Sequence, residues 1–313
     1  MNRQQLLAVV EDTWRQLDAA IEGLDEAALT EPGVVEAWSI KDLLGHITAW
    51  EQMALRRVER WRRGEPLIDP DWTSTDAYNA GEADRRRDVP LSAMQTEAAE
   101  TRQRLRATLE ALTDDEWATV VGEDRLRAPI GDWIGGDLGG VGPGTHATEH
   151  AQHIRAWRDA RERRRAEQFA TLISARRELL RSIDGLSESE LTAAREGEWS
   201  IQDTLAHIAA WDRLMVRCIE AWLEGTSPPE LSSDVEAFNA QAAAQARAES
   251  PAATLIGLAR THEDLLAAVQ RANGRSGTFQ YPVGTFDDMS QMASETAAHE
   301  REHVEQIRAW RDQ

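Results

Sequence analysis

The feature that most constrains this chain is an internal repeat that covers nearly its whole length. The motif Trp-Ser-Ile-x-Asp-x-Leu-x-His-Ile-x-Ala-Trp occurs at Trp38–Trp50 and again at Trp199–Trp211. Downstream of each copy, a His-x-x-x-His pair leads into the same tail, Ile-Arg-Ala-Trp-Arg-Asp. Such a long repeat predicts two similar folding units, each with its own core. We place unit 1 at residues 1–163 and unit 2 at residues 164–313.

Composition limits the classes of partner and the compartment. The net charge of −20 repels nucleic-acid phosphates and anionic lipids, which predicts no nucleic-acid and no membrane partner. No apolar run approaches the ~20 residues that a membrane span needs. The N-terminal segment is polar, and Cys218 is the only cysteine. Both features predict a cytoplasmic chain without an internal disulfide.

Apolar residues at helical spacing predict four helices in each unit and an all-α fold of two tandem four-helix bundles. The first helices are expected at Gln4–Gly23 and Phe169–Gly185, and the third at Pro90–Leu112 and Pro251–Ala272. The second helices should begin after Ser39 and Ser200, with Asp42 and Asp203 completing a capping box. The fourth helices carry the histidine pairs. No helix breaker interrupts residues 145–184, so the fourth helix of unit 1 is expected to continue into unit 2.

The remaining segments are assigned to connections. The glycine-rich stretch Gly131–Gly144 and the segment Asn273–Gly284 are expected to be loops, either of which can hold a short hairpin or a lid. A repeated aromatic–Asn pair precedes each third helix, where it either caps the helix or forms a pocket wall. Together with two repeated tryptophans, these pairs are the predicted substrate-pocket residues: Tyr78, Asn79, Phe238, Asn239, Trp50 and Trp211.

Six of the eight histidines belong to the repeat and form two candidate metal sites. Histidines four residues apart lie on one face of a helix, and their imidazoles can reach one ion. The third donor is expected from the second helix, where apolar neighbours turn the histidine inward. Alternatively, the helix-two histidines are core residues and the pairs lie at the surface. Because the triad occurs twice, we favour metal sites at His46, His146 and His150, and at His207, His299 and His303.

Two glutamates also repeat within the histidine pairs. Glu149 and Glu302 are candidate catalytic bases or partners of the ligands, or they are simply solvated. The segment His299–His303 also matches the zinc-protease pattern H-E-x-x-H. However, the glutamate of that pattern, Glu300, aligns with Ala147 in unit 1, so we reject the protease assignment.

Both copies of the Trp-Ser motif, with their later histidine pairs, resemble the DinB-like superfamily of four-helix bundles. The Asn79 and Asn239 segments and the His-x-x-Glu-His endings are most similar to its ClbS/DfsB branch. The resemblance implies a divalent metal, of the zinc, nickel or manganese type, on the three histidines of each unit. It also implies a small-molecule substrate and, for some relatives, a small thiol cosubstrate. Single-unit relatives often pair, so two fused units predict a monomer that contains a pseudo-dimer.

The resemblance and the residues together favour a metal-dependent enzyme that acts on a small electrophilic molecule. The expected reaction is hydrolytic ring opening or thiol transfer, in detoxification or self-resistance. Two alternatives remain open. One is a non-catalytic bundle that binds or sequesters an apolar ligand in tryptophan-lined cavities. The other is a stress-associated protein whose bundles are purely structural.

Overall fold

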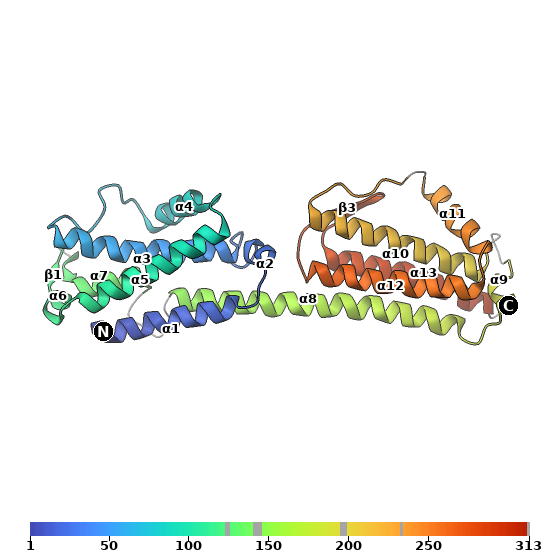
Figure 1. Cartoon of the computed structure of the whole chain (residues 1–313), viewed down its shortest axis with the longest axis horizontal. Coiled ribbons are helices and arrows are strands. Elements are labelled where there is room, and N and C mark those ends of the chain that lie inside the picture. Colours follow the sequence, from blue (N-terminus) through green and yellow to red (C-terminus); the bar gives the residue numbers. More distant parts are fainter. Residues whose placement is uncertain (123–125, 140–145, 195–198, 232–233, 312–313) are drawn as a thin grey trace. The chain divides into compact units, whose positions relative to one another are not determined.

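The computed structural model describes residues 1–122, 126–139, 146–194, 199–231 and 234–311. The chain divides into two compact units, Met1–Arg158 and Asp159–Gln313. The described part is mainly helical in both units (Figure 1). This confirms the predicted all-α fold of two tandem helical bundles.

Unit 1 is built from four long helices. They are α1 (Arg3–Ile21), α3 (Ile40–Arg62), α5 (Leu91–Ala111) and the first part of α8 (His146–Ile183). Shorter helices lie in the connections: α2 (Glu26–Thr30), α4 (Thr75–Arg86), α6 (Asp114–Ala118) and α7 (Ile130–Asp137). A small antiparallel hairpin pairs β1 (Val120–Val121) with β2 (Ala128–Pro129).

Unit 2 repeats this plan. Its long helices are the later part of α8, α10 (Ile201–Glu224), α12 (Pro251–Ala272) and α13 (Met289–Arg311). The shorter helices are α9 (Glu188–Thr192) and α11 (Val235–Arg247), and a hairpin pairs β3 (Phe279–Tyr281) with β4 (Gly284–Phe286). The unbroken α8 confirms that the fourth helix of unit 1 continues into the first helix of unit 2.

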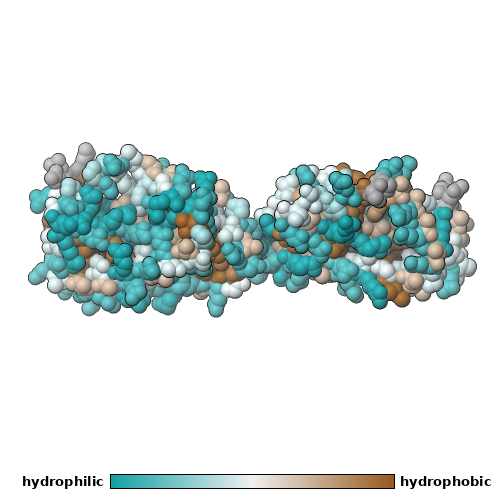
Figure 2. All heavy atoms as spheres, turned by 45° about the horizontal axis from the view of Figure 1, so that its top comes forward, coloured by the Kyte–Doolittle hydropathy of each residue, from teal (hydrophilic) through white to brown (hydrophobic). Residues whose placement is uncertain are grey.

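Each unit has its own apolar interior, and most of the visible surface is hydrophilic (Figure 2). In unit 1, Leu43, Leu109 and Ile154 are completely buried. In unit 2, Cys218 and Leu265 are completely buried. Burial of such side chains supplies the main favourable term in folding, about 25 cal/mol per Å² of apolar surface. The cysteine therefore serves as a small core residue.

Capping boxes start the two helices that carry the first histidine of each unit. The Ser39 hydroxyl accepts a hydrogen bond from the Asp42 backbone N–H at 3.2 Å, and the Asp42 carboxylate accepts one from the Ser39 N–H at 2.9 Å. Ser200 and Asp203 make the equivalent pair at 3.1 and 2.8 Å. Both predicted caps are confirmed, and they satisfy backbone donors that a helix start leaves free.

The loop predicted at Gly131–Gly144 is wrong over its first part, because α7 occupies it. Ile130 and Ile134 are completely buried and anchor this helix in the core. Gly131 is required for close packing, since a Cβ there would lie 2.2 Å from the Trp117 ring. Residues 140–144 lie outside the described residues. In unit 2, the segment Asn273–Gly284 contains β3 of a short hairpin, as expected.

The aromatic–Asn pairs were also misplaced. Tyr78 and Asn79 lie inside α4, and Phe238 and Asn239 lie inside α11. The N-caps of α4 and α11 are Ser74 and Asp234, and the N-caps of the third helices, α5 and α12, are Pro90 and Ser250. The capping interpretation of these pairs is therefore wrong. Separately, none of the described helices is both long and apolar enough to cross a membrane.

Ser39→Ala and Ser200→Ala each remove the side-chain acceptor of a capping box. We expect each to lower the free energy of unfolding of its unit by about 1 kcal/mol, because a helix N–H then loses its partner. Urea denaturation followed by circular dichroism measures the change. Ser92→Ala, on an exposed position of α5, is the control. A loss of equal size in the control would contradict the capping assignment.

Candidate metal centres

The three repeated histidines of unit 1 converge. His46 projects from α3, and His146 and His150 lie one helical turn apart at the start of α8. The Nε2 atom of His146 lies 2.9 Å from Nε2 of His46 and 3.0 Å from Nε2 of His150. His46 and His150 are buried. The predicted triad is therefore brought together from two helices that are far apart in the sequence.

Unit 2 builds the same arrangement. His207 projects from α10, and His299 and His303 project from α13. The Nε2 atom of His299 lies 3.0 Å from Nε2 of His207 and 3.1 Å from Nε2 of His303. In each cluster the ring nitrogens lie within 4.8 Å of one another. The two triads thus match in residue type, in helix pairing and in the nitrogen that faces the centre.

This donor set fits a metal ion. Without a cation, an Nε2–H proton of the central histidine would be shared between the Nε2 atoms of the other two, and a hydrogen bond divided in this way is weak. A cation instead accepts a lone pair from each of the three Nε2 atoms. In unit 2, the Nδ1 atom of His303 lies 2.8 Å from the amide oxygen of Gln306. Nδ1–H therefore donates to this oxygen, which leaves the Nε2 lone pair turned toward the cluster. Partners of this kind orient histidine ligands in metal sites.

Burial keeps the imidazoles neutral. It lowers the pKa of His46 and His299 to about 4 and that of His150 and His207 to about 3, with neighbouring histidines lowering it further. Burial also lowers the pKa of His146 and His303, and the carboxylates of Glu149 and Glu302 oppose this shift. Neutral imidazoles present lone pairs at neutral pH, as a metal ligand must.

The predicted pocket residues divide into two groups. Trp50 lines a small cavity with His146, and Trp211 lines a cavity with His299. Each indole N–H donates to an asparagine oxygen, that of Asn79 at 3.1 Å and that of Asn239 at 3.0 Å. The two asparagines thus orient the tryptophans that border the histidine clusters.

The aromatic neighbours of these asparagines line other cavities. Tyr78 lines a cavity of about 420 Å³ with Trp72 and Arg56, and Phe238 lines one of about 280 Å³ on unit 2. The histidines are not among the residues that line either cavity. The predicted catalytic glutamates, Glu149 and Glu302, are exposed on α8 and α13. Their negative charges raise the pKa of His146 and His303, against the lowering effect of burial.

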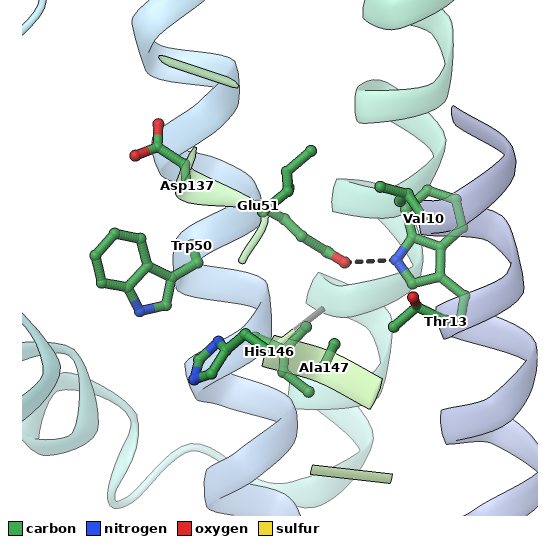
Figure 3. Close-up of a pocket in the computed structure, with 10 residues that line it drawn as sticks. Val10, Thr13, Trp50, Glu51, Asp137, His146 and Ala147 are labelled. Atoms are coloured by element: carbon green, nitrogen blue, oxygen red, sulfur yellow. Dashed lines mark hydrogen bonds between the residues drawn. The ribbon is translucent and has the colours of Figure 1, made fainter. Parts of the chain in front are cut away.

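The sequence analysis did not identify Glu51, a buried glutamate beside the histidine cluster of unit 1. Glu51 is 3% exposed and accepts a hydrogen bond from the Trp14 indole at 2.5 Å, the dashed line in Figure 3. It lines the same cavity of about 20 Å³ as His146. Burial raises the pKa of Glu51 to about 7, against the opposing effect of the Trp14 hydrogen bond. An acidic residue directly after the repeated Trp50 was the available signal.

Unit 2 uses an ionic network at the equivalent place. Asp212, which follows Trp211 as Glu51 follows Trp50, accepts a hydrogen bond from Arg176 at 2.8 Å. Arg176 also donates to Glu300 on α13. All three side chains are buried. Glu300, the glutamate of the rejected zinc-protease pattern, is therefore part of an ionic network. This network links α8, α10 and α13.

Glu51→Gln should make unit 1 more stable at alkaline pH. The pKa of Glu51 rises from 4.5 to about 7 on folding, so the folded state binds this proton more tightly and stability falls as pH rises through that window. Glutamine does not titrate, so the variant lacks this loss of unfolding free energy. In the wild-type chain the loss amounts to about 3 kcal/mol above pH 7 and to almost nothing below pH 4.5.

Urea titrations of chelator-treated protein at pH 4.5 and pH 8 measure this difference. Glu59→Gln, at an exposed position of the same helix, is the matched control. A gain in stability that is equal at both pH values would contradict the buried, protonated state of Glu51.

A weak structural similarity corrects one prediction. The chain is similar to the colibactin self-resistance protein ClbS, whose crystal structure is of a complex with a dsDNA. The identity is 15%, the TM-score is 0.41, and the alignment covers 49% of this chain and 93% of ClbS. This finding contradicts the prediction that the chain has no nucleic-acid partner, and that prediction is withdrawn. Net charge describes the whole chain, whereas contact with phosphates depends on local basic side chains.

The family relationship is clear from the sequence. None of the curated proteins matches the chain. Two stretches, residues 10–138 and 171–307, match the DinB superfamily, and together they cover most of the chain. The second stretch includes all three histidines of unit 2, whereas the first ends before His146. The repeat, the two helical bundles and the matches agree: this chain belongs to the DinB superfamily and contains two tandem copies of its domain.

Proposed function

We propose that this protein is a metal-dependent enzyme that acts on a small electrophilic molecule. The observation that carries the proposal is the convergence of three histidine Nε2 atoms, repeated in two units with separations of 2.9–3.1 Å. Each triad is partly or fully buried and neutral, and each is bordered by a tryptophan that an asparagine orients. These features fit a divalent cation better than a hydrogen-bonded core.

The proposed ligands are His46, His146 and His150 in unit 1, and His207, His299 and His303 in unit 2. Three protein donors are typical of catalytic sites, because they leave positions for water or substrate. A divalent ion lowers the pKa of a water or thiol and so supplies a nucleophile at neutral pH. Imidazole donors accept zinc, nickel and manganese alike, so metal analysis has to identify the ion.

The chain itself contributes binding and proton transfer. Trp50 and Trp211 supply apolar surface against which an electrophile packs, away from bulk water. We assign proton transfer to Glu149 and Glu302, which are exposed to solvent and lie one residue before the last histidine of each triad. The reaction is hydrolytic ring opening or thiol transfer. Assays with and without a small thiol separate the two.

His46→Ala and His207→Ala should each remove one equivalent of bound metal. The wild-type chain is expected to carry two ions, since each unit supplies a complete triad. Mass spectrometry of untagged protein purified without chelator measures the metal per chain, and circular dichroism checks that the helices persist. His153→Ala, an exposed histidine of α8 outside the repeat, should leave the metal content unchanged. Two ions retained in either triad variant would refute the ligand assignment.

A second candidate is a binding protein that sequesters an apolar ligand. One observation favours it: a cavity of about 520 Å³ in unit 1 is lined by Trp61, Trp133, Leu67 and Leu126, and no histidine is among its lining residues. Tryptophan fluorescence that responds to apolar compounds, in a protein that binds no zinc, nickel or manganese and turns over no electrophile, would favour this function over the enzyme.

A further inference from the structure

The cavity beside the unit 2 histidines has one apolar and one acidic side. Its volume is about 220 Å³, far more than a single water requires. Trp211, Tyr281 and Phe286 form the apolar side, and the last two rings are stacked with centroids 4.3 Å apart. His299 and three carboxyl residues form the polar side: Asp212, Glu295 and Glu300.

Glu300 has a free oxygen in this wall. The residue is 2% exposed, and its Oε1 atom accepts a hydrogen bond from Arg176 Nε at 3.0 Å. Its Oε2 atom is buried and has no hydrogen-bond partner among the described residues. A buried carboxyl oxygen without a partner is costly, and most buried polar atoms are paired. A hydrogen-bond donor in the cavity would satisfy it.

The local charge favours the same kind of ligand. Arg176 is buried and donates to both Asp212 and Glu300, so a single guanidinium charge compensates two acidic groups. Burial lowers the pKa of the nearby His262 to about 4, so this imidazole adds no positive charge. Glu295 adds a further acidic group to the lining. An anionic ligand is disfavoured here, and a donor group is favoured.

Unit 1 differs at each of these positions. Trp14, nine residues before Gly23, stands where unit 2 has Arg176, nine residues before Gly185. Ala147 follows the first histidine of its pair where unit 2 has Glu300. The cavity that Trp14 and Ala147 line has a volume of only about 20 Å³. The polar wall is therefore a property of the unit 2 sequence and does not follow from the shared histidines.

We propose that the unit 2 cavity binds a small molecule whose N–H or O–H group donates a hydrogen bond to Glu300 Oε2 and whose apolar part contacts Trp211 and Tyr281. The identification of this molecule as the substrate rests on the proposed function, because the cavity adjoins His299. Glu300 then acts as a specificity residue. It selects uncharged or cationic donors over anions and over purely apolar molecules.

Matched aromatic probes test this proposal on the full chain: benzyl alcohol and benzylamine carry a donor, toluene carries none, and benzoate is an anion. Ligand-observed NMR titrations at pH 8, with and without chelator, give the dissociation constants. We expect both donors to bind at least fivefold more tightly than toluene, as one net hydrogen bond provides. Benzoate should bind most weakly of the four.

Glu300→Gln should abolish the preference for benzylamine over toluene while toluene affinity stays the same. Glu305→Gln, an exposed position on the same helix, should preserve the preference. Val283→Trp is a second variant that leaves the ionic network intact. Val283 is 47% exposed and lines the cavity, so the larger ring should weaken all three uncharged or cationic probes at least tenfold.

Equal binding of toluene and the two donors by the wild-type chain would overturn the proposal. So would a preference that survives Glu300→Gln, or probe binding that Val283→Trp leaves unchanged. The metal count remains a separate readout. A wild-type chain that keeps the preference in chelator but never binds metal would refute the proposed enzyme and retain the cavity assignment. A chain that binds two ions but does not prefer the donor probes over toluene would retain the proposed enzyme and refute the cavity assignment.

Discussion

The start of one helix determines where the first histidine of each site lies. The capping boxes at Ser39 and Ser200 set the first residue of α3 and α10, and His46 and His207 follow seven residues later. Each residue advances a helix by about 100°, so a start displaced by one position would turn the imidazole out of the bundle. With this register, both histidines meet the pair on the facing helix, and burial then keeps the imidazoles neutral.

The two units keep the same nitrogen donors but support them differently. In unit 1, the Trp14 indole fills the interior and donates to Glu51. In unit 2, Arg176 replaces the indole and joins Asp212 to Glu300. A buried guanidinium compensates two acidic groups, whereas one indole N–H satisfies a single carboxyl oxygen. The equivalent space is about 20 Å³ in unit 1 and about 220 Å³ in unit 2, where it has one apolar and one acidic side.

The errors of the sequence analysis have a common physical origin. Gly131 was assigned to a loop, although it lies in α7 and its missing Cβ leaves room for the Trp117 ring. Tyr78 and Asn79 were assigned to a connection, although they lie in a short helix whose asparagine holds Trp50. Local propensity describes a residue and its sequence neighbours, and these assignments depended on contacts with distant side chains.

The sequence alone determined the two-unit organisation, the long helices, the two serine caps and the three histidines of each unit. These follow from repetition, from helical periodicity and from capping chemistry, all of which are local in the chain. Only the tertiary structure decided which acidic residues are buried next to the histidines and how large the cavity beside each histidine cluster is. Glu51 and Glu300 look like ordinary charged residues in the sequence. Their partners, Trp14 and Arg176, come from another helix, and only folding creates the burial that gives these carboxyl groups their properties.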